Sequence, residues 1–288
     1  MKLLFFDDFK LGILKADAVV DVSDAVKAIP HNAPHELING LIARFAEYRR
    51  PLEEAAARGK GIPVAQVRIR PPVPKPYNIV AMAVNYMEDG TRAEPAPINA
   101  FHKSPSAVIG DGDTMVLPDV PATIFEGEAE VALVIGTRAS RVSPAEAWGY
   151  VRWVTAANDF GVYDLRYADG GSNVRSKGID GFTPLGPLLL DARAIDPATI
   201  HLRTWVNGLL VQDADADSDM FFSFADIVAD ISRLTTLEPG DIIAMGTALK
   251  ASASGGAAVQ NVNLTRLGGP IEVTISGIGT LSNPVETP

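Results

Sequence analysis

The chain has 288 residues, of which 47% are hydrophobic, and a formal net charge of −10. This content is ample for a buried core, and the acidic balance argues against nucleic acid as a partner. The chain has no cysteine, which excludes disulfides, thiolate nucleophiles and cysteine-based zinc or iron–sulfur sites.

The first 72 residues read as a small N-terminal region. Strands are expected over residues 2–6, 10–15 and 18–22, followed by a helix from His35 with one apolar face. Pro51 is expected to kink that helix or to start a second one, which Gly59 and Gly61 end. A proline-rich passage then links this region to a main domain over residues 73–288.

The main domain is mostly strand-like, with few helices. Asn207-Gly208 between two apolar runs predicts a two-residue hairpin, and residues 224–234 predict an amphipathic helix. Further strands are expected over residues 79–84, 151–157, 242–245 and 271–275. The predicted class is therefore β-rich α+β. The opening apolar run is too short for a signal peptide, and no stretch reaches the ~18 apolar residues of a membrane-spanning helix, so we expect a cytoplasmic protein without membrane contact.

Two glutamates precede the apolar strand of residues 131–135. Alternate side chains of a strand share a face, so Glu128 and Glu130 are expected to point the same way. Like charges side by side repel each other, and a hard divalent cation would relieve the repulsion. The alternative is a solvated outer face that also includes Glu126.

Other candidate sites are weaker. The acidic run of residues 213–219 lacks the glycine and the final glutamate of a calcium loop. Of the four histidines, only His102 lies near the glutamates in the expected fold, as a candidate for proton transfer. No nucleophile elbow, phosphate-binding loop or dinucleotide fingerprint is present.

Several blocks, in order, resemble the fumarylacetoacetate hydrolase family. They include Val84-Asn85-Tyr86, the F-x-K-x-P-S-A block at residues 101–107, and the E-x-E strand that ends at Gly136. Asn158-Asp159 follows, and then the K-x-x-D block at residues 177–180, the P-G-D block from Pro239 to Thr247, and the G-x-G-x-L-x-N-P-V block at residues 277–285. The resemblance covers the chain from about residue 78 to its end.

The resemblance implies a mixed β-sandwich roll, a homodimer, and a small-molecule 2-oxo acid as substrate. It implies that Glu128, Glu130 and Asp159 bind Mg²⁺, or Mn²⁺ or Ca²⁺, with Lys177 as a catalytic positive charge beside the metal. The substrate-binding residues that it implies are Tyr86, Lys103, Arg166 and Thr247.

The chain also departs from the family pattern. The histidine of the water-activating dyad, expected after Asn85-Tyr86, is absent. Glu88, Asp89 and Glu94 are nearby carboxylates that could replace it, and Glu88 and Asp89 are the candidate catalytic residues. The family's substrate-facing arginine and glutamine correspond here to Tyr163 and Arg166, and Arg166 could pair with a second substrate carboxylate.

We therefore expect a divalent-metal-dependent hydrolase that cleaves a C–C bond in a 2,4-dioxo acid of the acylpyruvate or fumarylacetoacetate type, through a metal-stabilised enolate. The alternative is a lyase or isomerase on a related 2-oxo acid, namely a decarboxylase, a tautomerase or a sugar-acid dehydratase. The missing histidine favours this alternative, since these reactions need no attacking water. A non-catalytic binding protein is the third hypothesis, and the retained carboxylates and lysine argue against it.

Overall fold

The fold is organised on one large mixed sheet. The computed structural model describes residues 1–86, 97–248 and 262–287. Among them a 12-stranded sheet runs in the order β4-β3-β2-β1-β14-β12-β11-β17-β6-β7, with β5 paired to β1 and β8 paired to β14. Its strands are β1 (Lys2–Phe6), β2 (Lys10–Lys15), β3 (Ala18–Asp21), β4 (Gly61–Pro63), β5 (Ile69–Arg70), β6 (Ile79–Met82), β7 (Ala100–Lys103), β8 (Val108–Ile109), β11 (Ala129–Ile135), β12 (Val151–Asn158), β14 (Thr183–Asp191) and β17 (Ile242–Ala244).

Smaller sheets complete the β structure. The hairpin of β15 and β16 turns at Asn207 and Gly208, both of which have positive φ, as a type I′ turn requires. The predicted hairpin is thus present. The sheets are β16 (Leu209–Asp215) with β15 (His201–Val206), β19 (Ile271–Ile275) and β20 (Gly279–Asn283); β13 (Gly161–Val162) with β10 (Ile124–Glu126) and β18 (Val262–Asn263); and β21 (Val285–Glu286) with β9 (Met115–Val116).

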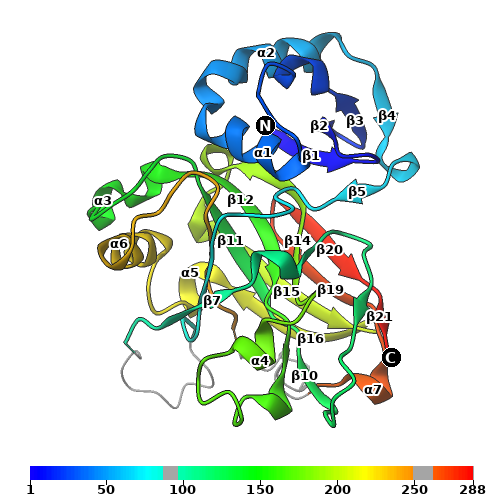
Figure 1. Ribbon diagram of the computed structural model, residues 1–288, viewed down its shortest axis with the longest axis vertical. Coiled ribbons are helices and arrows are strands. Elements are labelled where there is room, and N and C mark those ends of the chain that lie inside the picture. The colour runs from blue at the N-terminus through cyan, green and yellow to red at the C-terminus, as the bar shows by residue number, and fades with distance from the viewer. Residues whose placement is uncertain (87–96, 249–261, 288) are drawn as a thin grey trace.

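The helices lie at the outside of the sheets (Figure 1). None of the described helices is long and apolar enough to cross a membrane. The α-helices are α1 (Pro34–Ala43), α2 (Phe45–Arg58), α3 (Pro144–Ala147), α4 (Val174–Lys177), α5 (Ala216–Asp219), α6 (Phe224–Leu234) and α7 (Leu264–Leu267). Short 3-10 helices are η1 (Ser23–Val26), η2 (Val64–Gln66), η3 (Pro105–Ala107), η4 (Trp148–Tyr150), η5 (Tyr163–Leu165), η6 (Ala192–Ala194) and η7 (Pro197–Thr199).

The break between the two N-terminal helices differs from the sequence expectation. It falls at Arg44, whose φ is −120°, whereas Pro51 lies inside α2. The expectation that Pro51 divides the helices was therefore wrong. Phe45, the first residue of α2, packs edge-on against Trp153 of the sheet at 4.8 Å between ring centroids. This tertiary contact, rather than a local helix breaker, positions the start of α2.

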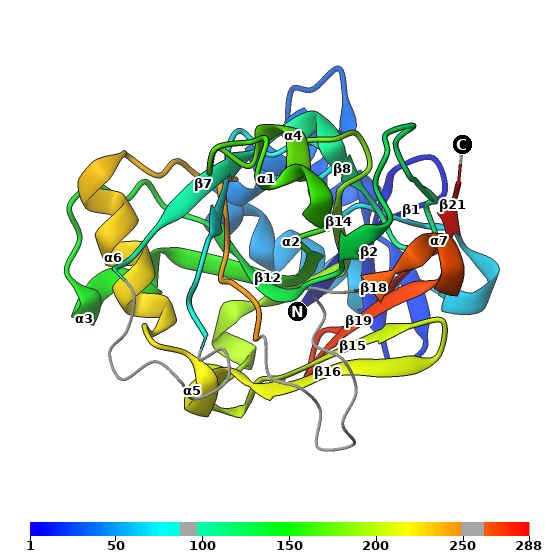
Figure 2. The same cartoon turned by 90° about the horizontal axis from the view of Figure 1, so that it is seen from below.

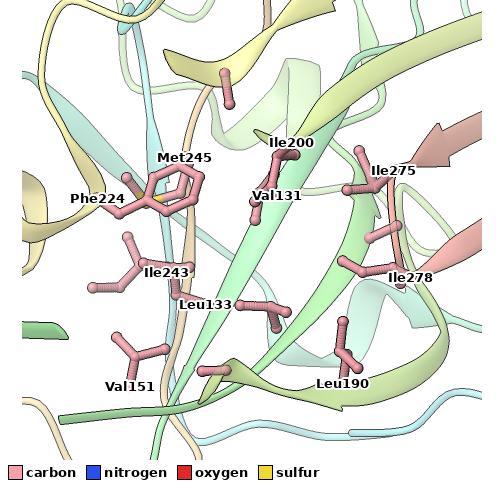
Figure 3. Close-up of a cluster of buried hydrophobic side chains, with 14 of the residues drawn as sticks. Val131, Leu133, Val151, Leu190, Ile200, Phe224, Ile243, Met245, Ile275 and Ile278 are labelled. Atoms are coloured by element: carbon pink, nitrogen blue, oxygen red, sulfur yellow. The ribbon is translucent and has the colours of Figure 1, made fainter. Parts of the chain in front are cut away.

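Strand β11 is buried on both faces, and each face packs into a different core. Val131 and Leu133 belong to the core that includes Ile275 of β19 and Phe224 of α6 (Figure 3). Val134 belongs to the core formed with the N-terminal helices. Such burial explains the unbroken apolar run in the sequence. It also makes β11 a fixed base for the side chains at its N-terminal end.

The N-terminal strands extend the same sheet, because β1 pairs antiparallel with β14. In Figure 1 the blue N-terminal elements lie together at one end of the molecule. A boundary between residues 72 and 73 stays a prediction. The overall class agrees with the β-rich α+β expectation.

Candidate metal centre

Three carboxylates meet where β11 begins and β12 ends. In the register of these strands Ala129 lies opposite Asn158. One step outward, the backbone N–H of Asp159 donates to the carbonyl of Glu128 at 3.0 Å. Glu128, Glu130 and Asp159 each offer an oxygen, and these oxygens lie within 4.8 Å of one another. The structure thus brings together the three residues named as metal ligands from the sequence.

The cluster is buried, which makes its negative charge costly. Burial raises the pKa of Glu128 to about 8, and the neighbouring carboxylates Glu126 and Asp159 contribute in the same direction. Burial, followed by the charges of Asp159 and Glu128, also raises the pKa of Glu130. One oxygen of Glu130, Oε2, accepts from the backbone N–H of Gly246 at 3.0 Å. The other, Oε1, has no partner among the described residues.

Two lysines lie against the cluster from different elements. Lys177, at the end of α4, donates to Oε2 of Glu128 and to Oδ2 of Asp159, both at 2.6 Å. Burial alone would lower the pKa of Lys177, but the charges of Asp159 and Glu128 raise it. Lys103, at the end of β7, bonds to Oδ1 of Asp159. Figure 2 shows α4 beside β7, the two elements that carry these lysines.

Asp159 is the most strongly ionised of the three carboxylates. Burial would raise its pKa, but the charges of Lys103 and Lys177 and their hydrogen bonds lower it to about 2. Lys103 also donates to the carbonyl of Phe182 at 2.8 Å and of Phe160 at 3.4 Å. All three of its protons are thus satisfied within the protein. Lys103 acts as a buried counter-ion here, and its predicted contact with substrate stays a prediction.

These residues fit a hard divalent cation. Three buried carboxylates with an unpartnered oxygen on Glu130 form an oxygen-rich donor set. Burying several carboxylates without an equal number of cations is unfavourable. Among the described residues, the positive charges of Lys103, Lys177 and Arg166 do not fully balance the four carboxylates Glu126, Glu128, Glu130 and Asp159. A cation would complete the neutralisation.

A cavity opens beside the cluster. Its lining includes three of the residues predicted to bind substrate, namely Tyr86, Arg166 and Thr247, together with Glu128 and Lys177. The hydroxyl of Tyr86 is buried and has no partner among the described residues. Burial and the nearby charge of Glu130 raise the pKa of Tyr86, so this hydroxyl stays protonated and is available as a donor.

Thr247 is held by its surroundings. Its hydroxyl donates to the carbonyl of Ala129 at 3.0 Å and accepts from Nε2 of Gln212 at 2.6 Å. Gln212 is fully buried and also donates to the carbonyl of Ala248 at 2.7 Å. Gln212 was not identified from the sequence. Nothing in its local sequence shows that β16 passes beneath this site.

Glu126 and Arg166 form an ion pair at the edge of the cavity. Nη1 of Arg166 donates to Oε1 of Glu126 at 3.0 Å, with the carboxylate fully buried and the arginine side chain 43% exposed. The outer-face alternative for the three glutamates was therefore wrong. Arg166 was identified from the sequence, but its ion pair with Glu126 was not. The shared parity of Glu126 with Glu128 and Glu130 was the signal that could have revealed it.

The histidines lie elsewhere. His102 is exposed on β7, whereas its neighbour Lys103 is buried, so alternation along the strand turns His102 away from the cluster. Proton transfer by His102 in this site was a wrong expectation. His201 contacts Asp213 and Asp215 on the β15–β16 hairpin. The candidate base residues Glu88, Asp89 and Glu94 lie outside the described residues.

Comparison with known proteins identifies the family. Residues 77–286 match the family model described as fumarylacetoacetate (FAA) hydrolase C-terminal. The chain belongs to the fumarylacetoacetate hydrolase family. A curated relative, oxaloacetate tautomerase YisK of Bacillus subtilis (strain 168), is 31% identical over 95% of this chain and 94% of its own length.

Solved structures of the family agree in fold. Maleylpyruvate hydrolase from Sphingobium sp. SYK-6, in complex with manganese(II) ion and pyruvate, is 31% identical with a TM-score of 0.83 and covers 100% of this chain and 99% of its own. Fumarylacetoacetate hydrolase from Exiguobacterium antarcticum is 28% identical with a TM-score of 0.84, and each chain is covered to 100%. The relatives are hydrolases, isomerases, tautomerases and decarboxylases, so this chain is an enzyme of the same group.

Proposed function

We propose that this enzyme interconverts the keto and enol forms of a 2-oxo acid that carries a second carboxylate, as oxaloacetate does. The observation that carries the choice of a dicarboxylate substrate is the position of Arg166. It lines the same cavity as Glu128 and Lys177, and Glu126 holds it there. An arginine at the open edge of the cavity suits a distal carboxylate, while the carboxylate cluster lies at the reacting end.

The metal in this proposal is Mg²⁺ or Mn²⁺, with Ca²⁺ as a further candidate, held by Glu128, Glu130 and Asp159. When bound, such a cation supplies Lewis-acid polarisation of the substrate's oxygens. Lys177 adds a fixed positive charge where negative charge develops as a proton leaves C3 of the substrate. The buried hydroxyl of Tyr86, unpartnered among the described residues, is a hydrogen-bond donor for a substrate oxygen.

Proton transfer at C3 requires a base. The four histidines of the chain are His31, His35, His102 and His201, and none of them belongs to the carboxylate cluster of the described chain. Glu88 and Asp89 stay the proposed bases. A tautomerisation requires only that a proton be removed and returned, so the missing water-activating histidine is no obstacle to it.

The second candidate is hydrolysis of an acylpyruvate of the fumarylacetoacetate type, with C–C cleavage. It is supported by the similarity to the Sphingobium enzyme, a hydrolase whose structure holds manganese and pyruvate. The same cluster would stabilise the enolate of a pyruvate leaving group. Decarboxylation and sugar-acid dehydration use an equivalent intermediate and are the remaining lyase alternatives. A cytoplasmic homodimer completes the proposal.

The experiment is product analysis by NMR with Mg²⁺ or Mn²⁺. Enzyme is mixed with enol-oxaloacetate, with a panel of acylpyruvates and with 2-keto-3-deoxy sugar acids. The proposal predicts accelerated equilibration of enol and keto forms with no loss of carbon. Release of pyruvate and a carboxylic acid from an acylpyruvate, without tautomerisation of oxaloacetate, would establish the hydrolase instead. Release of CO₂ or water would establish a lyase.

A further inference from the structure

A second charged cleft lies at the opposite end of β11 and β12 from the carboxylate cluster. Its lining combines the junction of α1 and α2 with the far ends of the two strands. The cleft lies at the C-terminal end of β11, and the seven residues of this strand span ~20 Å, so the cleft is about that far from Glu130. The lining includes Phe45, Arg49, Gly136, Arg152 and Arg193.

The cleft is positively charged, although the chain as a whole is acidic. Of the described residues that line it, three are arginines and none is a carboxylate. Arg49 comes from α2, Arg152 from β12, and Arg193 from η6. Burial lowers the pKa of Arg152, and the charges of Arg193 and Arg49 act in the same direction, so each of these two arginines lies near enough to Arg152 to repel its charge.

Two carboxylates beside the cleft offset part of this charge. Asp191 accepts from Nη2 of Arg152 at 2.6 Å and from the backbone N–H of Arg193 at 3.1 Å. Glu53 pairs with Arg49 at 3.0 Å, and both side chains of that pair are about half exposed. Within the described chain, the guanidinium of Arg193 has no ion-pair partner. The net charge of the three arginines and two carboxylates is therefore positive.

Arg152 is held rigidly in this cleft. Its guanidinium carbon lies 4.3 Å from the ring centroid of Phe45 and 5.1 Å from that of Trp153. Its Nε is buried, with no hydrogen-bond partner in the part of the chain that the structure describes. A Cβ on Gly136 would lie 2.2 Å from Cβ of Arg152, so only glycine leaves room for the arginine stem. The position of this cation is therefore fixed by packing.

We propose that this cleft binds a phosphate group, either as the free ion or at the end of a phosphorylated metabolite. Its volume is about 350 Å³, within the ~300–1,000 Å³ range of small-ligand sites. Guanidinium groups approach it from three separate segments of the chain. A tetrahedral dianion presents oxygens in several directions and can meet all three, whereas a carboxylate lies in one plane. The bound phosphate bridges the N-terminal helices and the central sheet.

The test is calorimetric titration of the full chain, in Mg²⁺ and at constant ionic strength, with inorganic phosphate. We expect saturable binding and a matching rise in Tm, because a ligand of the folded state stabilises it. Arg193→Gln and Arg49→Gln should each weaken binding about tenfold by removing a charge-assisted hydrogen bond. Arg50→Gln is the matched control, because Arg50 also forms an i,i+4 ion pair on α2 but does not line this cleft.

Other outcomes overturn the proposal. Absent binding, or binding that neither Arg193→Gln nor Arg49→Gln weakens, would contradict it; the second result would place the phosphate elsewhere, for example at the metal. If malonate binds as tightly as phosphate, and the same variants weaken its binding, the preference for a tetrahedral anion would be contradicted. Phenyl phosphate that binds more tightly than the free ion would support the site and identify an ester as its ligand.

Discussion

Nζ of Lys177 lies 2.6 Å from Oδ2 of Asp159, although the two residues come from different elements. Asp159 follows β12, and Lys177 ends a single turn of helix. The pair fixes a positive charge at the centre of a carboxylate cluster. The two kinds of residue have different roles in one site. The carboxylates can hold a cation, and the lysine can stabilise negative charge on the substrate.

The first prediction concerns the metal. Glu130→Gln removes a buried carboxylate whose Oε1 is unpartnered among the described residues. Calorimetry with Mn²⁺ should show a loss of affinity greater than ~100-fold. Removing a residue that only hydrogen-bonds to a metal ligand typically costs ~10–100-fold, and Glu130 is expected to bind the metal directly. Glu126→Gln is the matched control, because it is equally buried but pairs with Arg166. Equal losses in the two variants would exclude the assignment of Glu130.

The second prediction separates metal binding from turnover. Lys177→Met removes a cation from the cluster, so Mn²⁺ affinity should be retained or increased. The kcat of the metal-loaded enzyme should fall about 10²–10³-fold, as when a charge-stabilising group is lost. Arg175→Met, an exposed change on the same helical turn, should leave both values unchanged. Unchanged kcat in Lys177→Met would show that this lysine is only structural.

The third prediction concerns substrate choice. Arg166→Gln should raise KM for 2-oxo dicarboxylates by about 10–100-fold, because a charge-assisted contact with the distal carboxylate is lost. It should leave KM for 2-oxo monocarboxylates nearly unchanged. Glu126→Gln, which frees Arg166 from its anchor, should have a smaller effect in the same direction. Equal increases in KM for both substrate classes would show that Arg166 does not bind the second carboxylate.

The fourth prediction concerns pH and stability. Burial alone would lower the pKa of His201, but its hydrogen bonds with Asp215 and Asp213 raise it above the ordinary 6.5. The interaction of protonated His201 with the two aspartates therefore stabilises the fold fully below pH 6.5. This stabilisation is lost as the pH rises through the raised pKa of His201. Denaturant unfolding should show His201→Asn to be less stable than the parent by about 0.5–1 kcal/mol at pH 5.5, with a smaller difference at pH 9. A difference that does not change with pH would contradict this.

Much of the fold could be predicted from local sequence. The apolar runs of β1 and β11, the turn at Asn207 and Gly208, and the amphipathic pattern of α6 all have their cause within a few residues. The division of α1 from α2 could not, because it depends on the packing of Phe45 against Trp153, more than 100 residues away. Such contacts leave no local pattern.

The same distinction applies to the site. The two glutamates of β11 share a face for a reason that is visible in the sequence, namely the alternation of a strand. By contrast, nothing in the sequence indicated that Lys103, predicted to bind substrate, is buried against Asp159. The ion pair of Glu126 with Arg166 joins residues 40 apart in the sequence. Both contacts depend on how the strands are arranged in space, which a short motif does not specify.

The most direct test of metal-dependent enolisation is hydrogen–deuterium exchange at C3 of pyruvate and of oxaloacetate in D₂O, followed by NMR. Tautomerisation, acylpyruvate hydrolysis and decarboxylation all form an enol or enolate, and C3 gains or loses a proton as that species interconverts with the keto form. We predict rapid exchange with enzyme and Mn²⁺ or Mg²⁺, and only the uncatalysed rate with Glu130→Gln or after chelation of the metal. Exchange that persists without metal, or its absence with the loaded enzyme, would contradict metal-dependent enolisation at this cluster.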